Sequence, residues 1–377
     1  MPDRLPVVVL SHLRWNFVYQ RPQHVLSRLA ASRPVLFVEE PVHDPRARPH
    51  AELARPQPNV LVCRPHTPVS APGFVDAHLP VLHGIIDELV RSEHIDDFVL
   101  WTYTPMPMPL VRKLGPLAIV YDCMDELSAF LGSPPELVPR ERELFRVADL
   151  VFTGGPSLYR AKRDLHPAVH CFPSSVDVAH FARARDGLRE AADQAPLPRP
   201  RLGFYGVIDE RLDLRLLDAL ATSHPEWQIV MIGPTVKIDP AVLPRRPNIT
   251  YFGQRSYDDL PAYLAGWDVC LLPFALNDAT RFISPTKTLE YMAAERPIVA
   301  TPITDVAEPY RTLVYLGETP REFVAACERA LDAGEAERRA RAGGMRRTLA
   351  GTSWDATVAA MDRLIEAAVE KRRSRAA

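Results

Sequence analysis

The sequence is poor in cysteine, carries no excess of either charge and has no long apolar run. The few cysteines are scattered and form no Cys-x-x-Cys pair, so we expect neither a disulfide framework nor a zinc site, and a reducing cytoplasm fits best. A formal net charge of −2 gives no indication of nucleic-acid binding. The first apolar run, Val7–Leu10, is too short for a signal sequence or a membrane span, and no later run approaches membrane-spanning length.

What the chain does contain is a repeated alternation of short apolar runs and amphipathic stretches. The runs are rich in β-branched residues and lack polar alternation, which is typical of parallel strands buried on both faces. Helical patterns such as Leu137–Val147 lie between them, as in consecutive β-α-β units. The expected strands are Val7–Leu10, Val35–Val38, Val60–Cys63, Phe98–Tyr103, Ala118–Tyr121, Leu150–Thr153, Val169–Phe172, Leu202–Gly206, Gln228–Gly233, Ile249–Gly253, Val269–Phe274, Ile298–Thr301 and Leu313–Leu316.

Residues 183–200 interrupt this rhythm, because they are charged, rich in alanine and end in a proline cluster, which is typical of a linker. With 377 residues, 47% of them hydrophobic, the chain is long enough for two cores. The sequence therefore predicts an α/β fold of two doubly wound Rossmann-like domains, residues 1–182 and 201–353, that face across a cleft where ligands bind outside the carboxyl ends of the strands. A final helical segment, 354–377, ends in a basic tail.

The segment that begins at Ser284 predicts an anion site. Ser284 is a suitable N-cap and Pro285 suits the first helical position, so the helix would direct free N–H groups and its positive dipole end at a ligand. Lys287 and Glu290 are three residues apart and share one helix face, where a cation and a carboxylate could hold a diphosphate and a ribose diol. The alternative is a capped surface helix with an i,i+3 ion pair.

Glycines end three successive strands of the second half, at Gly206, Gly233 and Gly253, and would let a ligand approach the backbone. Phe252 could flank a nucleobase, although it could equally be a core residue. Arginine binds phosphate through two parallel hydrogen bonds, so nearby arginines are further candidates. These are Arg211 and Arg281.

Polar residues follow the strands of the first half as well. His12 lies in an aromatic-rich loop directly after the first strand, and Asp122 and Asp125 end another strand. Carboxylates at such an edge are usually capped, paired or functional, so Asp122 could cap a turn while Asp125 and His12 are the candidates for catalysis. The acceptor-side candidates are Arg14, Trp15 and Arg21.

Together these motifs resemble the retaining glycosyltransferases of the two-Rossmann-domain GT-B fold, of the family-4-like kind. Ser284–Thr301 looks like their donor-site signature, and Pro173–Phe181 resembles the segment before their interdomain linker. The segments Ser11–Trp15, Gln20–His24 and Tyr121–Asp125 look like a bacterial subgroup involved in cell-surface and teichuronic-type polysaccharides. The resemblance covers nearly the whole chain.

The resemblance implies a role for each matching residue. Glu290 would bind the donor ribose hydroxyls, while Lys287 and the helix start Ser284–Thr286 would neutralise the leaving diphosphate. The final helix would return to the first domain. This chain departs from the family at Phe282, which replaces the first carboxylate of a Glu-x7-Glu pair, and at Arg211, the nearest match to the phosphate-binding Arg and Lys.

The resulting hypothesis is a cytoplasmic, metal-independent retaining glycosyltransferase without a cofactor. It would move a hexose-type sugar from a UDP- or GDP-sugar to a lipid-linked or polysaccharide acceptor. The alternatives are a nucleotide-sugar epimerase of the same architecture and a non-catalytic sugar-nucleotide-binding protein. The basic tail, 371–375, could be attracted weakly to the inner face of a membrane. We expect no nucleic-acid partner and assign no oligomeric state.

Overall fold

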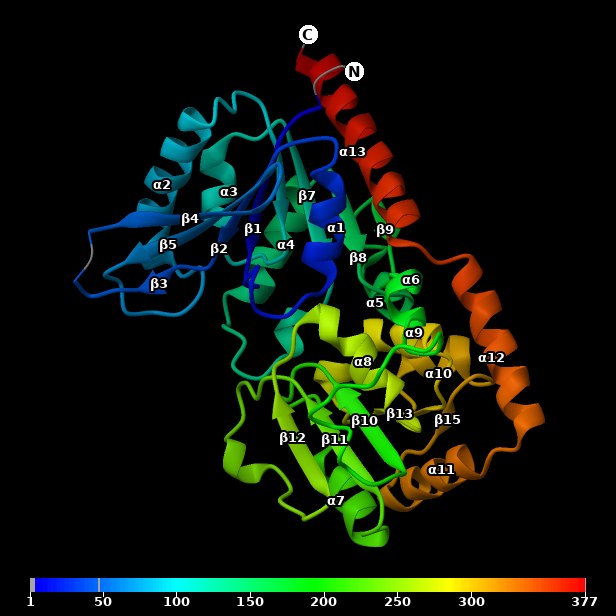
Figure 1. Cartoon of the computed structure of the whole chain (residues 1–377). Helices are drawn as coiled ribbons and strands as arrows, with labels where there is room; N and C mark the ends of the chain where they lie inside the picture. Colours follow the sequence, from blue (N-terminus) through cyan, green and yellow to red (C-terminus); the bar gives the residue numbers. More distant parts are fainter. Residues whose placement is uncertain (1–3, 47, 377) are drawn as a thin grey trace. The chain divides into compact units, whose positions relative to one another are not determined.

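A computed structural model describes residues 4–46 and 48–376 of the chain. The chain divides into two compact units, each built on its own predominantly parallel sheet (Figure 1). Unit 1 contains the residues up to Pro173 together with those from Asp355 on, and unit 2 contains Ser174–Trp354. The predicted fold class is therefore confirmed: the chain consists of two parallel-sheet α/β domains.

The sheet of unit 1 has the order β3-β5-β2-β1-β6-β7-β8-β9, with β4 added antiparallel to β5. Its central strands are completely buried, as their uninterrupted apolar sequences predict. The strands are β1 (Val7–Ser11), β2 (Val35–Glu39), β3 (Val42–His43), β4 (His50–Gln57), β5 (Val60–Thr67), β6 (Val99–Thr102), β7 (Ala118–Cys123), β8 (Leu150–Thr153) and β9 (Val169–Cys171).

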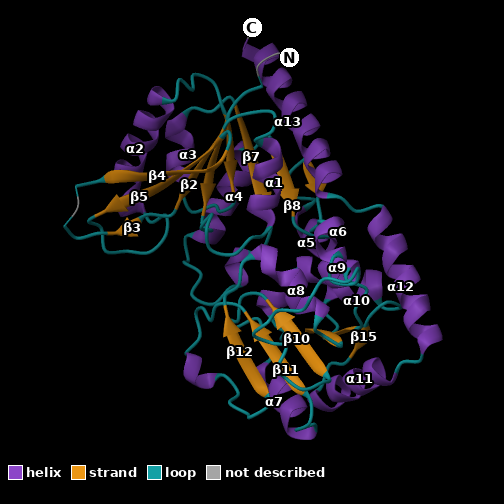
Figure 2. Ribbon diagram, in the orientation of Figure 1, coloured by secondary structure: helices purple, strands orange, loops and turns teal. Residues whose placement is uncertain are grey.

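Helices flank this sheet and connect its parallel strands (Figure 2). They are α1 (Arg21–Leu29), α2 (Leu79–Ser92), α3 (Met108–Leu114), α4 (Leu137–Val147), α5 (Pro156–Lys162) and most of α13 (Trp354–Ala376), with 3₁₀ turns at Asp76–His78 and Leu127–Ala129.

Helix α13 is fixed to unit 1 along its length. Its buried residues Val358, Met361, Ile365 and Val369 recur every three or four positions, which is the spacing of one helix face. Ion pairs add to this packing at both ends: Arg28 Nε lies 2.6 Å from Asp355 Oδ1, Arg33 Nη2 lies 2.6 Å from Glu366 Oε1, and Arg372 Nε lies 2.6 Å from Asp149 Oδ1. The basic end of the sequence is therefore the last part of a docked helix.

The sheet of unit 2 is entirely parallel, with the order β12-β11-β10-β13-β14-β15. Its strands are β10 (Arg201–Tyr205), β11 (Gln228–Ile232), β12 (Ile249–Gly253), β13 (Val269–Leu272), β14 (Ile298–Ala300) and β15 (Tyr315–Leu316). Its helices are α6 (Val178–Ala182), α7 (Leu214–Ser223), α8 (Leu260–Ala265), α9 (Thr286–Ala293), α10 (Thr304–Tyr310), α11 (Pro320–Asp332) and α12 (Glu335–Ala350), with 3₁₀ turns at Pro240–Val242, Tyr257–Asp259 and Asp278–Thr280.

Each sheet contains a point where the strand order reverses. In unit 1, β1 lies between β2 and β6, and in unit 2, β10 lies between β11 and β13. Loops at the carboxyl ends of such strands diverge to opposite sides and leave a crevice, which is where open parallel sheets bind ligands. The loops after β1 and β10 are therefore the places where candidate residues could contact a ligand.

The segment 183–200 does not behave as a free linker. It contains no helix or strand, yet it packs on unit 2, and the units divide at Pro173 rather than at residue 182. The side chain of Gln194 is fully buried; its Nε2 donates to the carbonyl of Tyr263 at 2.8 Å, and its Oε1 accepts from Trp267 Nε1 at 3.1 Å. These buried polar contacts fix the segment, so composition alone misassigned it.

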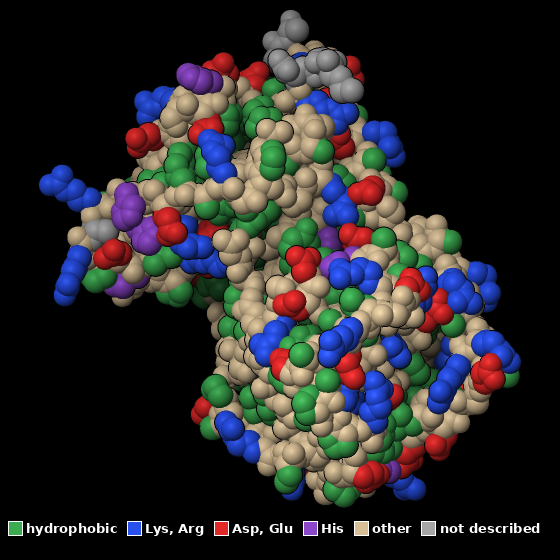
Figure 3. Space-filling view, in the orientation of Figure 1, with side chains coloured by type: hydrophobic (Ala, Val, Ile, Leu, Met, Phe, Trp, Pro, Cys, Tyr) green, Lys and Arg blue, Asp and Glu red, His purple; other side chains and the backbone are tan. Residues whose placement is uncertain are grey.

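The surface carries both signs of charge, interspersed over the face drawn in Figure 3. This distribution agrees with the net charge of −2 and shows no single basic stripe on that face. Within the described part of the chain, no helix is both long enough and apolar enough to cross a membrane.

Candidate active site

The predicted anion site is the start of α9 in unit 2. The helix begins at Thr286, with Pro285 as the N-cap residue and without a side-chain cap, so the prediction that Ser284 caps the helix was wrong. The carbonyl of Ser284 instead accepts a hydrogen bond from Ser174 Oγ at 2.9 Å, which holds the loop before the helix. The N–H of Thr288 donates to the carbonyl of Pro285 at 3.1 Å. The positive end of the helix dipole lies at this first turn.

Lys287 lies across the carboxyl end of β10. Its Nζ is 5.6 Å from the centre of the Phe204 ring, and its side chain passes Gly206 so closely that a β-carbon there would lie 2.1 Å from Lys287 Cε. Gly206 also has a φ of +137°, which side-chain-bearing residues rarely adopt. The glycine therefore makes room for the lysine and keeps its charge beside the start of α9.

The three predicted strand-end glycines are brought together by the parallel register. Gly206 N donates to the carbonyl of Ile232 at 2.8 Å, and Gly233 N donates to the carbonyl of Gly253 at 2.8 Å. A β-carbon on Gly233 would lie 1.8 Å from the carbonyl oxygen of Gly206, so only glycine fits this place. The carboxyl ends of β10, β11 and β12 thus present closely spaced backbone next to Lys287.

Glu290 is buried on the inner face of α9, with 6% of its surface exposed. The hydroxyl of Tyr205 donates to Glu290 Oε2 at 2.6 Å. Burial raises the pKa of Glu290 to about 7, although the Tyr205 hydrogen bond and the nearby charge of Lys287 act in the opposite direction. Because α9 is buried from Thr288 to Ala293, the alternative of an exposed surface helix is wrong.

Tyr205 was not among the residues that the sequence predicted. It ends β10, and its backbone N–H donates to the Tyr291 hydroxyl at 3.3 Å, so two tyrosines link β10 to α9. The sequence could have indicated this residue, because a tyrosine in a strand buried on both faces needs a hydrogen-bond partner for its hydroxyl.

The remaining donor-side candidates are Arg211, Arg281 and Phe252. Arg211 pairs with the buried Asp209, with Nη2 2.7 Å from Oδ2. Arg281 is exposed and its guanidinium lies 5.2 Å from the centre of the Phe282 ring. Phe252 is half-buried, and its ring centre lies 5.7 Å from that of Tyr263, so its environment favours the core alternative.

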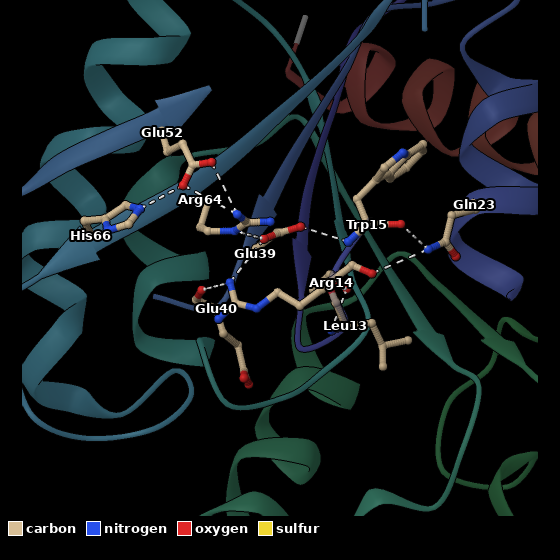
Figure 4. A network of polar contacts seen from close by, with 10 residues as sticks. Leu13, Arg14, Trp15, Gln23, Glu39, Glu40, Glu52, Arg64 and His66 are labelled. Carbon is tan, nitrogen blue, oxygen red and sulfur yellow. Dashed lines mark hydrogen bonds and ion pairs between the residues drawn. The ribbon is translucent and has the colours of Figure 1, made fainter. Parts of the chain in front are cut away.

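In unit 1, the loop after β1 is held by a network centred on Glu39, which is fully buried (Figure 4). Glu39 accepts from the backbone N–H of Trp15 at 2.8 Å, from Arg14 Nη1 at 3.1 Å and from Arg64 Nε at 2.8 Å. On the other side of the loop, Gln23 Nε2 donates to the carbonyl of Trp15 at 2.7 Å. Arg14 and Trp15, predicted to contact an acceptor, therefore shape the loop that carries His12.

Arg21 and Asp122 form a buried ion pair, with Arg21 Nη2 2.9 Å from Asp122 Oδ1. Arg21 Nη1 also donates to the carbonyl of Phe172 at 2.7 Å. Arg21 is 3% exposed, so its environment argues against direct contact with an acceptor, and Asp122 pairs with this arginine rather than capping a turn. The pair joins the start of α1 to the end of β7.

Asp125 and His12 are both half-buried and follow strands β7 and β1, which are separated in the sheet only by β6. The loop of Asp125 is fixed by Lys162, whose Nζ lies 2.7 Å from Glu126 Oε2 and 2.8 Å from Glu141 Oε2. Lys162 was not predicted, because its carboxylate partners lie far from it in the sequence.

Solved structures with the same arrangement of elements identify the fold. Sucrose-phosphate synthase from Thermosynechococcus elongatus matches with a TM-score of 0.73 and 17% identity, covering 96% of this chain and 98% of that chain. A structure described as trehalose-6-phosphate from E. coli bound with UDP-2-fluoro glucose matches with a TM-score of 0.68 and 15% identity, covering 97% of this chain and 99% of that chain. The fold is that of the GT-B glycosyltransferases.

Sequence comparisons agree with this class. Residues 199–333 match the family Glycosyl transferases group 1. A relative from Bacillus subtilis (strain 168), TuaH, whose name assigns it to teichuronic acid biosynthesis as a glycosyltransferase, is 26% identical over 274 residues, covering 66% of this chain and 68% of the relative. Part of unit 2 therefore matches the group 1 glycosyltransferases, and the comparisons support an enzyme of the glycosyltransferase type; an epimerase or a non-catalytic protein is not favoured.

Proposed function

We propose that this glycosyltransferase transfers a hexose-type sugar, with retention of its anomeric configuration, from a UDP- or GDP-sugar to a lipid-linked or polysaccharide acceptor. The observation that carries the proposal is the grouping of Lys287, the start of α9 and the buried Glu290 at the carboxyl edge of the unit 2 sheet. A nucleotide donor is supported by the E. coli neighbour described with UDP-2-fluoro glucose. A cell-surface acceptor is supported by the name of the B. subtilis relative.

The proposed role of this group is to bind the donor and stabilise the departing diphosphate. The bond from the anomeric carbon to the diphosphate breaks as the acceptor oxygen bonds to that carbon, so negative charge develops on the diphosphate. Lys287 and the first-turn N–H groups of α9 supply positive charge at that point. Because these groups supply that charge, we propose that the reaction needs no metal ion, and transfer should then persist in excess EDTA.

Glu290 is proposed to accept hydrogen bonds from the ribose hydroxyls. Its Oε2 already accepts from Tyr205, which leaves Oε1 for the ligand. In unit 1, Asp125 and His12 are proposed to contact the reacting sugar and the acceptor hydroxyl, whose proton must leave during transfer.

The first test is calorimetric titration of UDP, GDP, ADP and dTDP into wild type and Glu290→Ala. Selective binding of one nucleoside diphosphate that the variant loses would support the donor site and fix the donor class. Transfer to acceptor extracts, followed by NMR of the product's anomeric proton, then tests retention. The absence of binding by all four nucleotides would contradict the proposed site.

A further inference from the structure

A recess in unit 1 lies at the amino ends of its strands, whereas His12 and Asp125 follow the carboxyl ends. It has a volume of about 460 Å³ and is formed by the end of α3, the following turn, the end of α4 and α13. Ile119 lines it from the beginning of β7, and Ala148 lines it just before β8, so the recess lies at the amino ends of these strands. We call it the basic pocket, because its rim includes Arg112, Arg146 and Arg372.

The three arginines come from three different helices. Arg112 of α3 pairs with Glu143 of α4 at 2.5 Å, and Arg372 of α13 pairs with Asp149 at 2.6 Å. The second carboxylate oxygen of Asp149 accepts from the backbone N–H of Ile119 at 2.9 Å. Glu143 and Asp149 are therefore both paired with arginines of the rim. Arg146, one turn beyond Glu143 on α4, is exposed.

Two of the helices that form the pocket, α3 and α13, carry further basic residues next to the lining arginines in the sequence. The last turns of α13, from residue 370 on, contain Glu370 as the single acidic residue. Because α13 is fixed to unit 1 by its buried face, these charges are held in place and are not spread over a mobile tail. The additional exposed basic residues are Lys113 on α3 and Lys371, Arg373 and Arg375 on α13.

The lining combines this charge with an apolar interior. Met108, Val111, Ile119 and Val147 contribute aliphatic surface between the arginines. Guanidinium groups bind phosphate through parallel hydrogen bonds, and a recess of this volume is within the range of small-molecule sites. The chemistry that matches both features is an amphiphile with a phosphate headgroup, rather than a free sugar or a cation.

We propose that the basic pocket binds the phosphate headgroup of an anionic lipid and that the end of α13 attracts the surrounding anionic membrane surface. The inference does not depend on which acceptor the enzyme uses, because the pocket lies at the amino ends of the unit 1 strands while His12 and Asp125 follow the carboxyl ends. Each basic residue near an anionic bilayer strengthens binding by about fivefold, so several such residues close to the pocket give measurable adsorption.

Co-sedimentation of the full chain with vesicles tests the proposal. Vesicles of phosphatidylcholine with 30% phosphatidylglycerol should bind wild type, and binding should weaken as salt is raised, whereas pure phosphatidylcholine vesicles should not bind. Arg146→Ala should weaken binding by fivefold or more. The matched control is Arg246→Ala, which removes the same charge from an exposed ion pair with Asp218 in unit 2 and should leave binding unchanged. Circular dichroism confirms that both variants are folded.

A water-soluble lipid distinguishes the pocket from general surface attraction. Monomeric dihexanoyl phosphatidylglycerol should bind wild type at one site by calorimetry, and Arg146→Ala should abolish that binding. The proposal would be overturned if wild type did not bind phosphatidylglycerol vesicles. Equal losses of vesicle binding in Arg146→Ala and Arg246→Ala would also overturn it. Full displacement from vesicles by millimolar inorganic phosphate at constant ionic strength would overturn it as well, because the pocket would then be a site for small anions.

Discussion

The hydroxyl of Tyr205 at the end of β10 donates a 2.6 Å hydrogen bond to the buried carboxylate of Glu290 on α9. The two residues are 85 positions apart and belong to the elements that also bring Lys287 beside Gly206. The bond fixes one oxygen of the carboxylate and thereby the direction of the other. The first prediction below tests this bond, and the next two test the ionisation of Glu290.

Tyr205→Phe should weaken nucleoside diphosphate binding by about tenfold or more at pH 7. The substitution keeps the ring, which packs 5.1 Å from that of Tyr291, but removes a hydrogen bond to a charged group, typically worth about 1.5–3 kcal/mol. Calorimetry of the nucleotide identified for wild type measures the effect. An unchanged dissociation constant would show that the carboxylate is held without Tyr205.

Nucleotide binding should improve as the pH rises from 6 to 8. Burial raises the pKa of Glu290 to about 7, and only the ionised carboxylate is a full acceptor for a ribose diol. Affinity in wild type should therefore fall by about tenfold from pH 8 to pH 6. In Glu290→Gln the side chain does not titrate, so any remaining pH dependence of binding comes from the diphosphate itself. The same pH profile in wild type and in this variant would contradict the role of Glu290.

Stability should change with pH in the opposite sense. The folded-state pKa of Glu290 lies above its value of 4.5 in the unfolded chain, so the folded state binds the proton more strongly. This contribution is fully present below pH 4.5 and is lost as the pH rises to about 7, by at most about 3 kcal/mol. Urea unfolding of wild type and Glu290→Gln should show the variant gaining relative stability across this window. A constant difference would mean that the pKa is not raised.

Lys287→Ala should reduce turnover by roughly two orders of magnitude, because one preorganised positive group at a developing charge is worth about 3 kcal/mol in the barrier. The matched control is Arg246→Ala, since Arg246 is an exposed cation paired with Asp218 in unit 2 and its loss should leave turnover unchanged. Steady-state transfer rates with the identified donor give the comparison. Turnover close to wild type in Lys287→Ala would remove the lysine from the mechanism.

The buried pair of Arg21 and Asp122 should be essential for the stability of unit 1. Asp122→Ala leaves a buried guanidinium uncompensated and should lower the free energy of unfolding by about 3–5 kcal/mol. Arg246→Ala, which breaks an exposed pair, should cost less than about 1 kcal/mol. Urea unfolding, followed by circular dichroism, measures the free energy of unfolding of both variants. The double change Arg21→Met with Asp122→Leu should recover much of the loss, which separates the buried charge from a general packing defect.

The buried strands and the presence of α9 could be predicted because their signals are local, although the start of α9 was predicted one residue too early. Uninterrupted apolar runs such as Val7–Leu10 indicate a strand whatever lies around them. Strand β4, His50–Gln57, was missed because it is an exposed edge strand with charged residues and no apolar pattern. Helix α12 was missed because it is polar on most sides and is supported by pairs such as Arg341 with Glu337 at 3.0 Å.

The side-chain partners of the candidate site could not be predicted, because they join residues far apart in the chain. Arg21 and Asp122 are separated by 101 positions, and each alone resembles a ligand-binding residue. Only the fold shows that they satisfy each other. The same holds for Tyr205, which resembles an ordinary strand tyrosine until α9 is placed against it.

The docking of α13 has a consequence for the order of synthesis. Unit 2 is one continuous stretch, Ser174–Trp354, so all of its residues are synthesised before the rest of the last helix. Unit 1 starts earlier but finishes later, because its residues near Arg33 await Asp362 and Glu366 from the end of the chain. A chain truncated after Trp354 would thus hold a complete second unit and a first unit whose apolar helix-binding face is still open to chaperones, with Arg33 deprived of its carboxylate partners Asp362 and Glu366.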